Sequence, residues 1–237
     1  MYCVLGADGF IGRNLVKDLG ARGYGRKDLD LLDTSAVNKF FDENSFDTVI
    51  HCAAVGGSRL KADDWNVFLE NIKMFENVAR NAQKFKRLVW FSSGAAIYAK
   101  DTPYGFSKHM CETYAKLIPN CQVFRIYGCY GEDEPSTRFI SSCLRGPVHI
   151  NENKYFDFFW VGDIHKVLTN FTVCDGKVHE LVYKTKYKLF DVAKLNKAQV
   201  VSLSRDGGTS YIGEFDEEFA NANGIIDRPP VMYPSPS

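Results

Sequence analysis

The sequence lacks any hydrophobic run approaching the roughly 20 residues of a membrane-spanning helix, and it carries no net charge. Lysine plus arginine number 29, and aspartate plus glutamate also number 29. A chain without net charge has no overall field that would attract nucleic acid or an anionic membrane surface, so neither partner is expected. The hydrophobic content of 45% and the charged content of 24% are typical of a globular protein with one substantial domain.

Cysteine spacing typical of metal or redox motifs is also absent. The seven cysteines include no CxxC pair, and their odd number argues against a complete disulfide framework. We expect most of them to be small buried side chains in a reducing compartment. The five histidines show no metal-ligand spacing, so no metal site is predicted. Only MYCVL precedes the first glycine, which leaves no signal peptide, and a cytoplasmic location is expected.

Three glycines follow the first apolar stretch of the chain. Residues 2–5 (YCVL) predict a buried strand, and a helical pattern with apolar residues at 11, 15, 16 and 19 follows the glycines. Gly6 would allow a tight turn, Gly9 the approach of a pyrophosphate, and Gly12 close packing of the helix. Because helix N-termini stabilise phosphates, a dinucleotide-binding turn is predicted over an ordinary strand-to-helix turn. The predicted contacts of this turn also include Phe10, Ile11 and Arg13.

Apolar runs and helical patterns alternate along the remaining chain. Strands are predicted near residue 24, over 87–93 and 121–128, and within 47–57, where a strand runs into a loop of small residues. Helices are predicted from Thr34 or Ser35, either of which could be the cap, and over 66–83, 104–117 and 136–144. This order predicts an α/β fold, a doubly wound parallel Rossmann sheet with a small C-terminal substrate-binding annex. The Rossmann core would span 1–131, with 157–174 returning to it. The reduced substrate-binding region would comprise 132–156 and 175–237, and its end, PPVMYPSPS, is predicted to be loosely ordered.

Small and hydroxyl-bearing residues follow the predicted strands. Ligands of parallel sheets bind beyond the carboxyl ends of the strands. We therefore expect Ala53, Ala54, Ser92, Ser93 and the residues after Arg125 to lie along one ligand-binding edge.

A tyrosine and a lysine four residues apart open the helix predicted over 104–117. Thr102 and Pro103 fit its N-cap and first position, and Tyr104 and Lys108 would share one helix face. A tyrosine with a pKa near ~10 is a poor proton donor at neutral pH, but a nearby ammonium lowers that pKa. The pair taken alone is also compatible with an ordinary helix surface. Behind a glycine motif and an alternating sheet, the catalytic interpretation is favoured.

Several motifs together resemble the extended branch of the short-chain dehydrogenase/reductase superfamily, over about residues 2–197. The glycine spacing is GxxGxxG, and HCAA resembles the small-residue strand end beside the cofactor. RIYGCYGE resembles R-x-x-N-V-Y-G, with Gly128 in place of asparagine, and YFDFFWVGDI resembles R-D-F-x-x-V-x-D-[IL], with Phe156 in place of arginine. YKLFDVAKLNK resembles a later helical segment of these enzymes. Within the branch, DLDLLDTSAVNKFF and CAAVGG look closest to GDP-fucose synthase-like 4-ketoreductases.

The resemblance implies roles for residues at the start of the helix predicted over 104–117 and at the end of the strand predicted over 87–93. Tyr104 would transfer the proton and Lys108 would also bind the nicotinamide ribose. A serine would orient the substrate carbonyl, and we assign Ser93, with Ser92 as the alternative. Ser92, Ser93 and Gly94 are the predicted substrate contacts on this segment.

The cofactor is predicted from the end of the second strand. Basic residues there pair with the phosphate of NADP, whereas an acidic residue accepts the ribose hydroxyl of NAD. Arg26, Lys27 and Arg13 favour NADP, while Asp28 and Asp30 are the evidence for NAD. Asp30 is expected near the adenine, and Leu31 completes the predicted cofactor contacts.

The absence of ionisable side chains at two positions where related enzymes have them limits the reactions that the protein could catalyse. The Asp-Glu pair of the superfamily's dehydratases is replaced by Gly94, Ala95 and Ala96, which disfavours dehydration. The epimerising histidine of the fucose synthases aligns with Arg138, a poor general base that could instead bind a nucleotide diphosphate or lie exposed on a helix. The predicted function is an NADPH-dependent reductase of a nucleotide-linked keto sugar. An NAD-dependent epimerase and a non-catalytic dinucleotide-binding protein are the alternatives, and the resemblance also implies a homodimer.

Overall fold

The computed structural model describes residues 1–58 and 60–232. Contacts divide the chain into two compact units, the first formed by Met1–Ile126 with Thr172–His179 and the second by Tyr127–Phe171 with the chain from Glu180 onward. The predicted core extended to residue 131 and included 157–174, whereas most of that returning segment, 157–171, groups with the second unit. The assignment of cofactor and substrate binding to these parts stays a prediction.

The first unit is built around parallel strands, as predicted. One six-stranded sheet has the order β2-β1-β3-β4-β5-β9, and the pairs from β2 through β5 are parallel. The order reverses between β1 and β3, because the chain moves from β1 to one side and then returns to the other. Ligands of doubly wound sheets bind at such a reversal. The strands are β1 Tyr2–Leu5, β2 Arg22–Tyr24, β3 Phe46–His51, β4 Phe85–Ser93, β5 Cys121–Ile126 and β9 Val178–Leu181.

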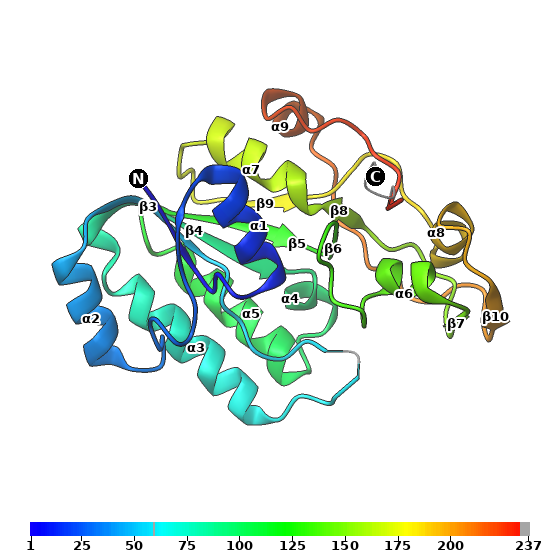
Figure 1. Cartoon of the computed structure of the whole chain (residues 1–237), viewed down its shortest axis with the longest axis horizontal. Coiled ribbons are helices and arrows are strands. Elements are labelled where there is room, and N and C mark those ends of the chain that lie inside the picture. Colours follow the sequence, from blue (N-terminus) through cyan, green and yellow to red (C-terminus); the bar gives the residue numbers. More distant parts are fainter. Residues whose placement is uncertain (59, 233–237) are drawn as a thin grey trace. The chain divides into compact units, whose positions relative to one another are not determined.

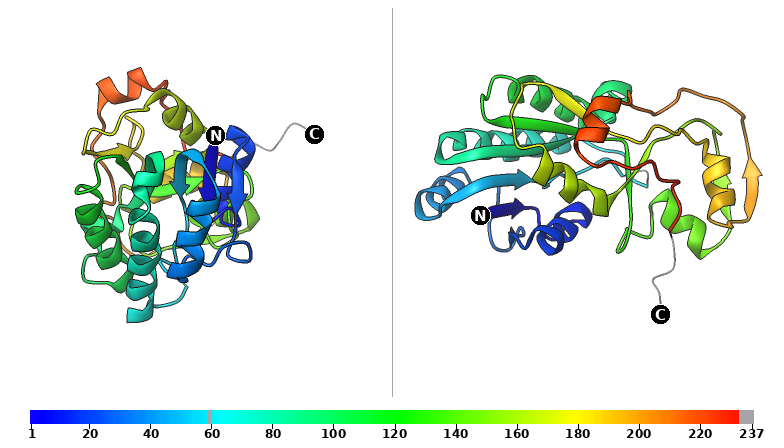
Figure 2. Two further views of the ribbon diagram at one scale, coloured as in Figure 1. Left: turned by 90° about the vertical axis from the view of Figure 1, so that its left-hand side faces the viewer. Right: turned by 90° about the horizontal axis from the view of Figure 1, so that it is seen from above.

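Helices cover both faces of this sheet (Figures 1 and 2). Helix α1 lies on one face, and α3 and α5 lie together on the other, with α2 packed beside α3. The core between the sheet and the second group includes Phe75, Leu88 and Trp90. The helices are α1 Phe10–Leu19, α2 Thr34–Glu43, α3 Trp65–Ala79, the short α4 Ala95–Tyr98 and α5 Pro103–Ala115, with a 3-10 turn, η1, at Ala82–Lys84.

The predicted starts of α5 and α2 are both observed, but only the predicted cap of α5 is correct. Thr102 is the N-cap of α5, its hydroxyl oxygen accepts from the Gly105 N–H at 3.1 Å, and Pro103 occupies the first helical position, so this prediction is confirmed. Helix α2 begins at Thr34, which confirms the predicted start, but neither Thr34 nor Ser35 is its cap. Asp33 is the cap, because its carboxylate accepts from the N–H groups of the second and third helical residues at 2.9 and 3.0 Å.

The second unit contains short elements around its own apolar core. Two two-stranded parallel sheets pair β6 with β8 and β7 with β10. Helix α6 begins at Phe139, three residues after the predicted start, and α8 forms in the segment predicted to hold a small helix. The elements are β6 Gly128–Tyr130, α6 Phe139–Arg145, β7 Val148–Ile150, β8 Phe158–Trp160, α7 Val161–Asn170, α8 Leu189–Leu195, β10 Val200–Leu203 and α9 Glu217–Ala222.

The C-terminal segment is more ordered than predicted where it is described. The Tyr130 hydroxyl donates to the Pro229 carbonyl at 3.0 Å. Asn196 donates to the Pro230 carbonyl at 2.8 Å and accepts from the Met232 N–H at 3.1 Å. The expectation of loose order is therefore wrong for residues 229–232, and for 233–237 it lies outside the described residues.

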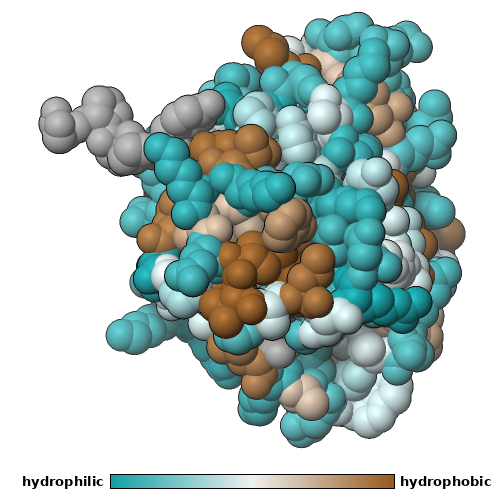
Figure 3. All heavy atoms as spheres, turned by 90° about the vertical axis from the view of Figure 1, so that its right-hand side faces the viewer, coloured by the Kyte–Doolittle hydropathy of each residue, from teal (hydrophilic) through white to brown (hydrophobic). Residues whose placement is uncertain are grey.

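Apolar side chains also gather on the outer face of the second unit. Figure 3 shows a hydrophobic patch on the face that carries α6, α8, β7 and β10. In these elements Leu144, Leu195, Val201 and Leu203 are each at least 40% exposed. The small core of this unit thus leaves part of its apolar surface uncovered.

Candidate functional site

A pocket of about 200 Å³ lies at the carboxyl ends of β1, β2 and β3, where the strand order reverses. The expected convergence of strand ends on one edge is present, because Leu5 pairs with His51, His51 with Trp90, and Ser93 with Ile126 in register. Of the predicted cofactor residues, the structure brings together in this pocket Gly6, Gly9, Arg26, Asp30, Leu31, Ala53 and Ala54. The other predicted cofactor residues do not line it: Phe10, Ile11, Gly12, Arg13, Lys27, Tyr104 and Lys108.

The glycine turn has the close approaches that its sequence predicts. Gly6 has a φ of +81°, and a side chain there would lie 2.6 Å from the Ala53 nitrogen. A Cβ at Gly12 would lie 2.2 Å from the Gly6 carbonyl oxygen, so Gly12 allows the helix to pack on the turn itself. Gly9 is the N-cap of α1 and supplies no side-chain cap, which leaves the backbone at the helix start open to an anion. A glycine cradle with an uncapped helix start fits a dinucleotide pyrophosphate.

Tyr104 and Lys108 lie one turn apart on α5, as predicted. The Lys108 Nζ is 5.7 Å from the centroid of the Tyr104 ring and 4.8 Å from that of Trp90, and it donates to the Phe91 carbonyl at 3.0 Å. The ammonium is buried, and burial lowers the pKa of Lys108 from 10.5 to about 8. A cation held this close to the phenol ring favours the phenolate electrostatically.

Acidic groups on α5 partly offset the burial of Lys108. The carboxylate of Glu112, one turn further along the helix, raises the pKa of Lys108. Burial raises the pKa of Cys111 to about 12, so this neighbour is a neutral thiol at pH 7. Glu112 is itself held by Arg125, which donates through Nε at 2.9 Å and through a terminal nitrogen at 2.7 Å. The charged surroundings of Lys108 are therefore fixed by an ion pair between α5 and β5.

His51 adds no titratable group at neutral pH. Burial, followed by the charge of Lys108, lowers the pKa of His51 to about 3. The buried imidazole lies parallel to the Phe75 ring at 6.4 Å between centroids, so His51 is part of the core. Among residues 1–58 and 60–232, no group of three or more histidine, cysteine, aspartate or glutamate side chains could hold a metal ion.

The two candidate serines differ in exposure. Ser92 is 4% exposed, and its hydroxyl has no hydrogen-bond partner among the described residues. Ser93 is half-buried, and its hydroxyl accepts from the Ala95 N–H at 3.2 Å. Gly94, the third predicted substrate contact, donates its N–H to the Ile126 carbonyl at 2.9 Å. Ser93 has the more accessible hydroxyl, which suits the assigned role better.

The loop after β3 contacts Tyr104, which the sequence did not reveal. Gly57 has a φ of +71°, and a Cβ there would lie 2.9 Å from both Cε1 and Cζ of the Tyr104 ring. Its N–H donates to the Asp63 carboxylate at 3.1 Å. The signal was present in the GG of CAAVGG, but nothing in the sequence indicates that this loop meets a helix 47 residues later. Asp8, inside the glycine motif, also lines the pocket and was not predicted to do so.

The two positions at which the sequence differs from the family motifs, Gly128 and Phe156, lie side by side in the second unit. A Cβ at Gly128, where the motif has asparagine, would lie 2.9 Å from the Phe156 ring, which stands where the motif has arginine. The Phe156 ring stacks on that of Tyr211 with centroids 4.9 Å apart. The aromatic ring therefore fills space beside the backbone of residue 128, and glycine at 128 makes room for it.

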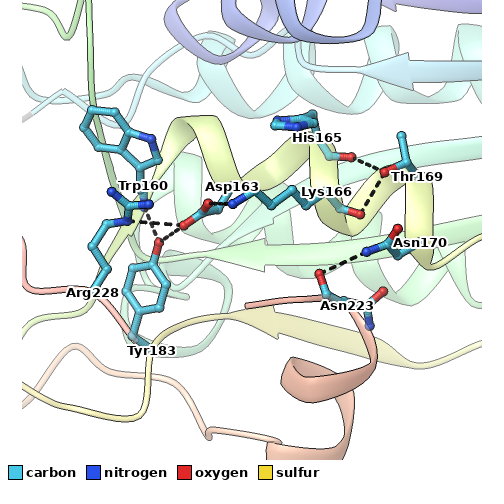
Figure 4. A network of polar contacts seen from close by, with 9 residues as sticks. All are labelled: Trp160, Asp163, His165, Lys166, Thr169, Asn170, Tyr183, Asn223 and Arg228. Atoms are coloured by element: carbon cyan, nitrogen blue, oxygen red, sulfur yellow. Dashed lines mark hydrogen bonds and ion pairs between the residues drawn. The ribbon is translucent and has the colours of Figure 1, made fainter. Parts of the chain in front are cut away.

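Asp163, the aspartate of the second motif, is the centre of a polar network in this unit (Figure 4). It is 3% exposed, and its carboxylate accepts from the Tyr183 hydroxyl at 2.6 Å and from Lys166 at 2.8 Å. The Arg228 Nε lies 3.4 Å from the same carboxylate, and the guanidinium lies over the Trp160 ring. This network fastens the start of α7 to two later segments of the unit.

Arg138 also belongs to the second unit. It is the N-cap of α6, and its guanidinium donates to the Cys129 carbonyl at 3.3 Å while the residue remains exposed. It is therefore an exposed arginine at a helix start, and its predicted contact with a diphosphate remains a prediction.

Comparisons with solved structures show related folds. A GDP-L-fucose synthetase from Naegleria fowleri, bound to NADP, is similar with a TM-score of 0.79 at 16% identity, over 96% of this chain and 88% of that one. A dTDP-4-dehydrorhamnose reductase from Bacillus anthracis, in complex with NADP, gives 0.80 at 18%, over 96% and 94%. A GDP-mannoheptose C4 reductase from Campylobacter jejuni, with NADP bound, gives 0.73 at 17%, over 94% and 96%.

The family follows from the sequence itself. A search of curated proteins finds no match to this chain. Residues 2–167, which include the glycine turn, Tyr104, Lys108 and the aspartate at 163, match the NAD dependent epimerase/dehydratase family. The chain therefore belongs to that family, within the extended short-chain dehydrogenases/reductases.

Proposed function

We propose that the protein is an NADPH-dependent reductase of a nucleotide-linked keto sugar, with Tyr104 as the proton donor. The observation that carries the proposal is the pairing of Tyr104 with the buried ammonium of Lys108, in the same unit as a glycine-lined pocket of about 200 Å³. The solved structures with the same fold include NADP-bound proteins described as nucleotide-sugar reductases. Their TM-scores of 0.73–0.80, at 16–18% identity, support the fold, and the substrate class enters as part of the proposal.

The chain's own residues would carry the proton chemistry. The Tyr104 hydroxyl gives its proton to the carbonyl oxygen of the ketone, and the ammonium of Lys108 stabilises the resulting phenolate. The Ser93 hydroxyl donates a hydrogen bond to the same oxygen and holds it toward the phenol. When bound, the reduced nicotinamide supplies the two electrons and the hydrogen that the carbonyl carbon takes up.

NADP as cofactor is supported by the pocket and by the similar structures. Arg26 lines the pocket after the end of β2, where a planar guanidinium suits a ribose phosphate. Lys27 and Arg13 lie outside the lining and contribute only to the general charge. The NADP-bound structures named above add support from proteins of the same fold.

Reduction is favoured over dehydration by the residues after Ser93. Gly94, Ala95 and Ala96 are all buried and carry no ionisable side chain. An elimination needs a base and an acid beside the sugar ring, and this segment supplies neither. The proposal is therefore a reductase without a dehydratase step at this position.

The decisive experiment follows oxidation of NADPH at the nicotinamide absorbance band with a panel of GDP- and dTDP-linked 4-keto sugars. Tyr104→Phe should lower kcat by about 10²- to 10⁴-fold, the usual contribution of a positioned general acid. Tyr114→Phe, which changes a tyrosine on the same helix at a partly exposed position, is the matched control and should keep full activity. Failure of every such sugar would reject the proposal and favour a non-catalytic binding protein, and equal rates for wild type and Tyr104→Phe would reject Tyr104 as the proton donor.

An NAD-dependent epimerase is the second candidate, favoured by the description of the family to which the chain belongs. An epimerase keeps its cofactor through an oxidation and a reduction, whereas a reductase exchanges it. Mass spectrometry of the dinucleotide released from purified protein separates the two. NAD retained at one equivalent indicates the epimerase, and NADP or empty protein indicates the reductase.

A homodimer through α3 and α5 is part of the proposal. The rings of Phe68 on α3 and Phe106 on α5 stack at 5.2 Å, which ties the two helices together. Their outer surfaces leave large apolar side chains exposed, including Trp65 and Leu69 on α3 and Met110 on α5. Light scattering of the full chain should give twice the monomer mass, and Leu69→Glu should give a monomer.

A cytoplasmic location is also proposed, supported by the seven cysteines, all of which are free thiols. Within the described part of the chain, no helix has the length and apolar character to cross a bilayer. Secretion of the full chain with formation of disulfides between these thiols would contradict the proposal.

A further inference from the structure

Asp8, in the glycine turn, lies beside the residue that follows strand β2 at the pocket. A Cβ built on Gly25, the residue after β2, would lie 2.0 Å from Oδ2 of Asp8, 2.5 Å from its Cγ and 2.7 Å from Oδ1. Both carboxylate oxygens therefore occupy the space that a side chain at position 25 would take. Asp8 and Gly25 line the same pocket as Gly9 and Arg26.

The two aspartates of the segment after β2, Asp28 and Asp30, accept hydrogen bonds from the backbone of that segment. The Asp28 carboxylate accepts from the Gly25 N–H at 2.8 Å, and the Asp30 carboxylate accepts from the Leu32 N–H at 3.1 Å. No hydrogen bond to the carboxylate of the exposed Asp8 is found among residues 1–58 and 60–232. Asp8 is thus an acceptor in the glycine turn, beside the end of β2, whose carboxylate remains available to a ligand.

Position and chemistry together indicate which ligand atoms it would meet. In doubly wound folds, an acidic side chain at the end of the second strand accepts hydrogen bonds from the adenosine ribose hydroxyls, and a phosphate there needs an arginine. Here Gly25 supplies no side chain, and the acidic group reaches the same place from the glycine turn. Arg26 stands beside it, so the pocket holds one acceptor suited to a hydroxyl and one cation suited to a phosphate.

We infer that Asp8 is a specificity-determining residue that accepts the 2′-hydroxyl of the adenosine ribose and lets the pocket bind NADH as well as NADPH. The inference rests on the proposed function, in that the pocket must hold a nicotinamide dinucleotide. A carboxylate beside the ribose repels a 2′-phosphate, so Asp8 weakens NADPH binding while the guanidinium of Arg26 strengthens it. The ratio of the two affinities is set by this pair.

The test measures dissociation constants of the full chain for NADH and NADPH by calorimetry, and for ADP-ribose and 2′-phospho-ADP-ribose as probes of the ribose site alone. Asp8→Asn keeps the shape and removes the charge. It should weaken NADH and ADP-ribose by about tenfold or more, as expected for a hydrogen bond to a charged acceptor, and leave the 2′-phosphorylated ligands unchanged or tighter. Asp18→Asn, at an exposed position of α1 outside the pocket lining, is the matched control and should preserve the ratio, and Arg26→Gln should weaken only the phosphorylated ligands.

The outcomes separate this inference from the function on which it rests. If NADPH binds but Asp8→Asn shifts all four ligands equally or none, Asp8 does not discriminate and the inference is overturned while the proposed function stands. If wild type binds NADPH and not NADH, the inference is likewise overturned. If neither dinucleotide binds wild type, the proposed function fails together with it.

Discussion

Lys108 offers a test in which stability and activity move in opposite directions. The buried ammonium has a pKa of about 8 in the folded protein, against 10.5 as its ordinary value. Because one pKa unit corresponds to about 1.4 kcal/mol, keeping this charge buried at pH 7 costs about 3 kcal/mol. Lys108→Met removes the charge and also the donor to the Phe91 carbonyl, worth about 1 kcal/mol. We expect a net stabilisation of about 2 kcal/mol together with loss of reductase activity.

The stabilisation expected for Lys108→Met depends on pH in a direction that can be predicted. Below pH 8 the lysine is charged in both the folded and the unfolded chain, so the cost is fully present. Between pH 8 and 10.5 the unfolded chain binds more protons, so wild-type stability rises with pH and the advantage of the variant disappears. Urea unfolding at pH 7 and pH 10 measures both points, and Lys100→Met at an exposed position is the control. A Lys108→Met protein that is less stable than wild type at pH 7 would refute the reasoning.

Three further changes test other parts of the structure. Gly12→Ala places a methyl group 2.2 Å from a backbone oxygen, so it should abolish dinucleotide binding by calorimetry, whereas Gly146→Ala, with open space around it, should not. Arg125→Met leaves the buried Glu112 carboxylate unpaired, and denaturant unfolding should show a loss of about 3–5 kcal/mol, a value near zero being the contrary result. Tyr183→Phe removes a buried hydroxyl donor to a carboxylate in the second unit, and the loss should be about 1–3 kcal/mol by the same measurement.

The sequence predicts best what depends on local pattern. Strands β1 to β5 and the start of α5 follow from apolar runs, from Thr102 and from Pro103, each of which acts within a few residues, whereas β9 was not predicted. The cap of α2 was predicted wrongly because Asp33 stands beside two other residues able to cap a helix. Only the geometry of the chain shows which oxygen faces the free N–H groups.

Contacts between distant segments are what the sequence does not contain. Asp8 meets Gly25 across 17 residues, and its carboxylate reaches the backbone only because glycine has no side chain. The coupled departures at Gly128 and Phe156 are 28 residues apart and look independent until the ring is seen beside the glycine. The end of the chain at 229–232 was predicted to be loose from its prolines, yet its carbonyls serve as acceptors for buried side chains.

The contact between Gly57 and the Tyr104 ring makes the position of the phenol depend on a residue that has no side chain. Any side chain at 57 must either move the ring or move the loop that Asp63 holds. Gly57→Ala would therefore leave every proposed catalytic group chemically intact while changing the packing between this loop and the phenol ring. It separates the presence of the tyrosine from its placement, which Tyr104→Phe cannot do.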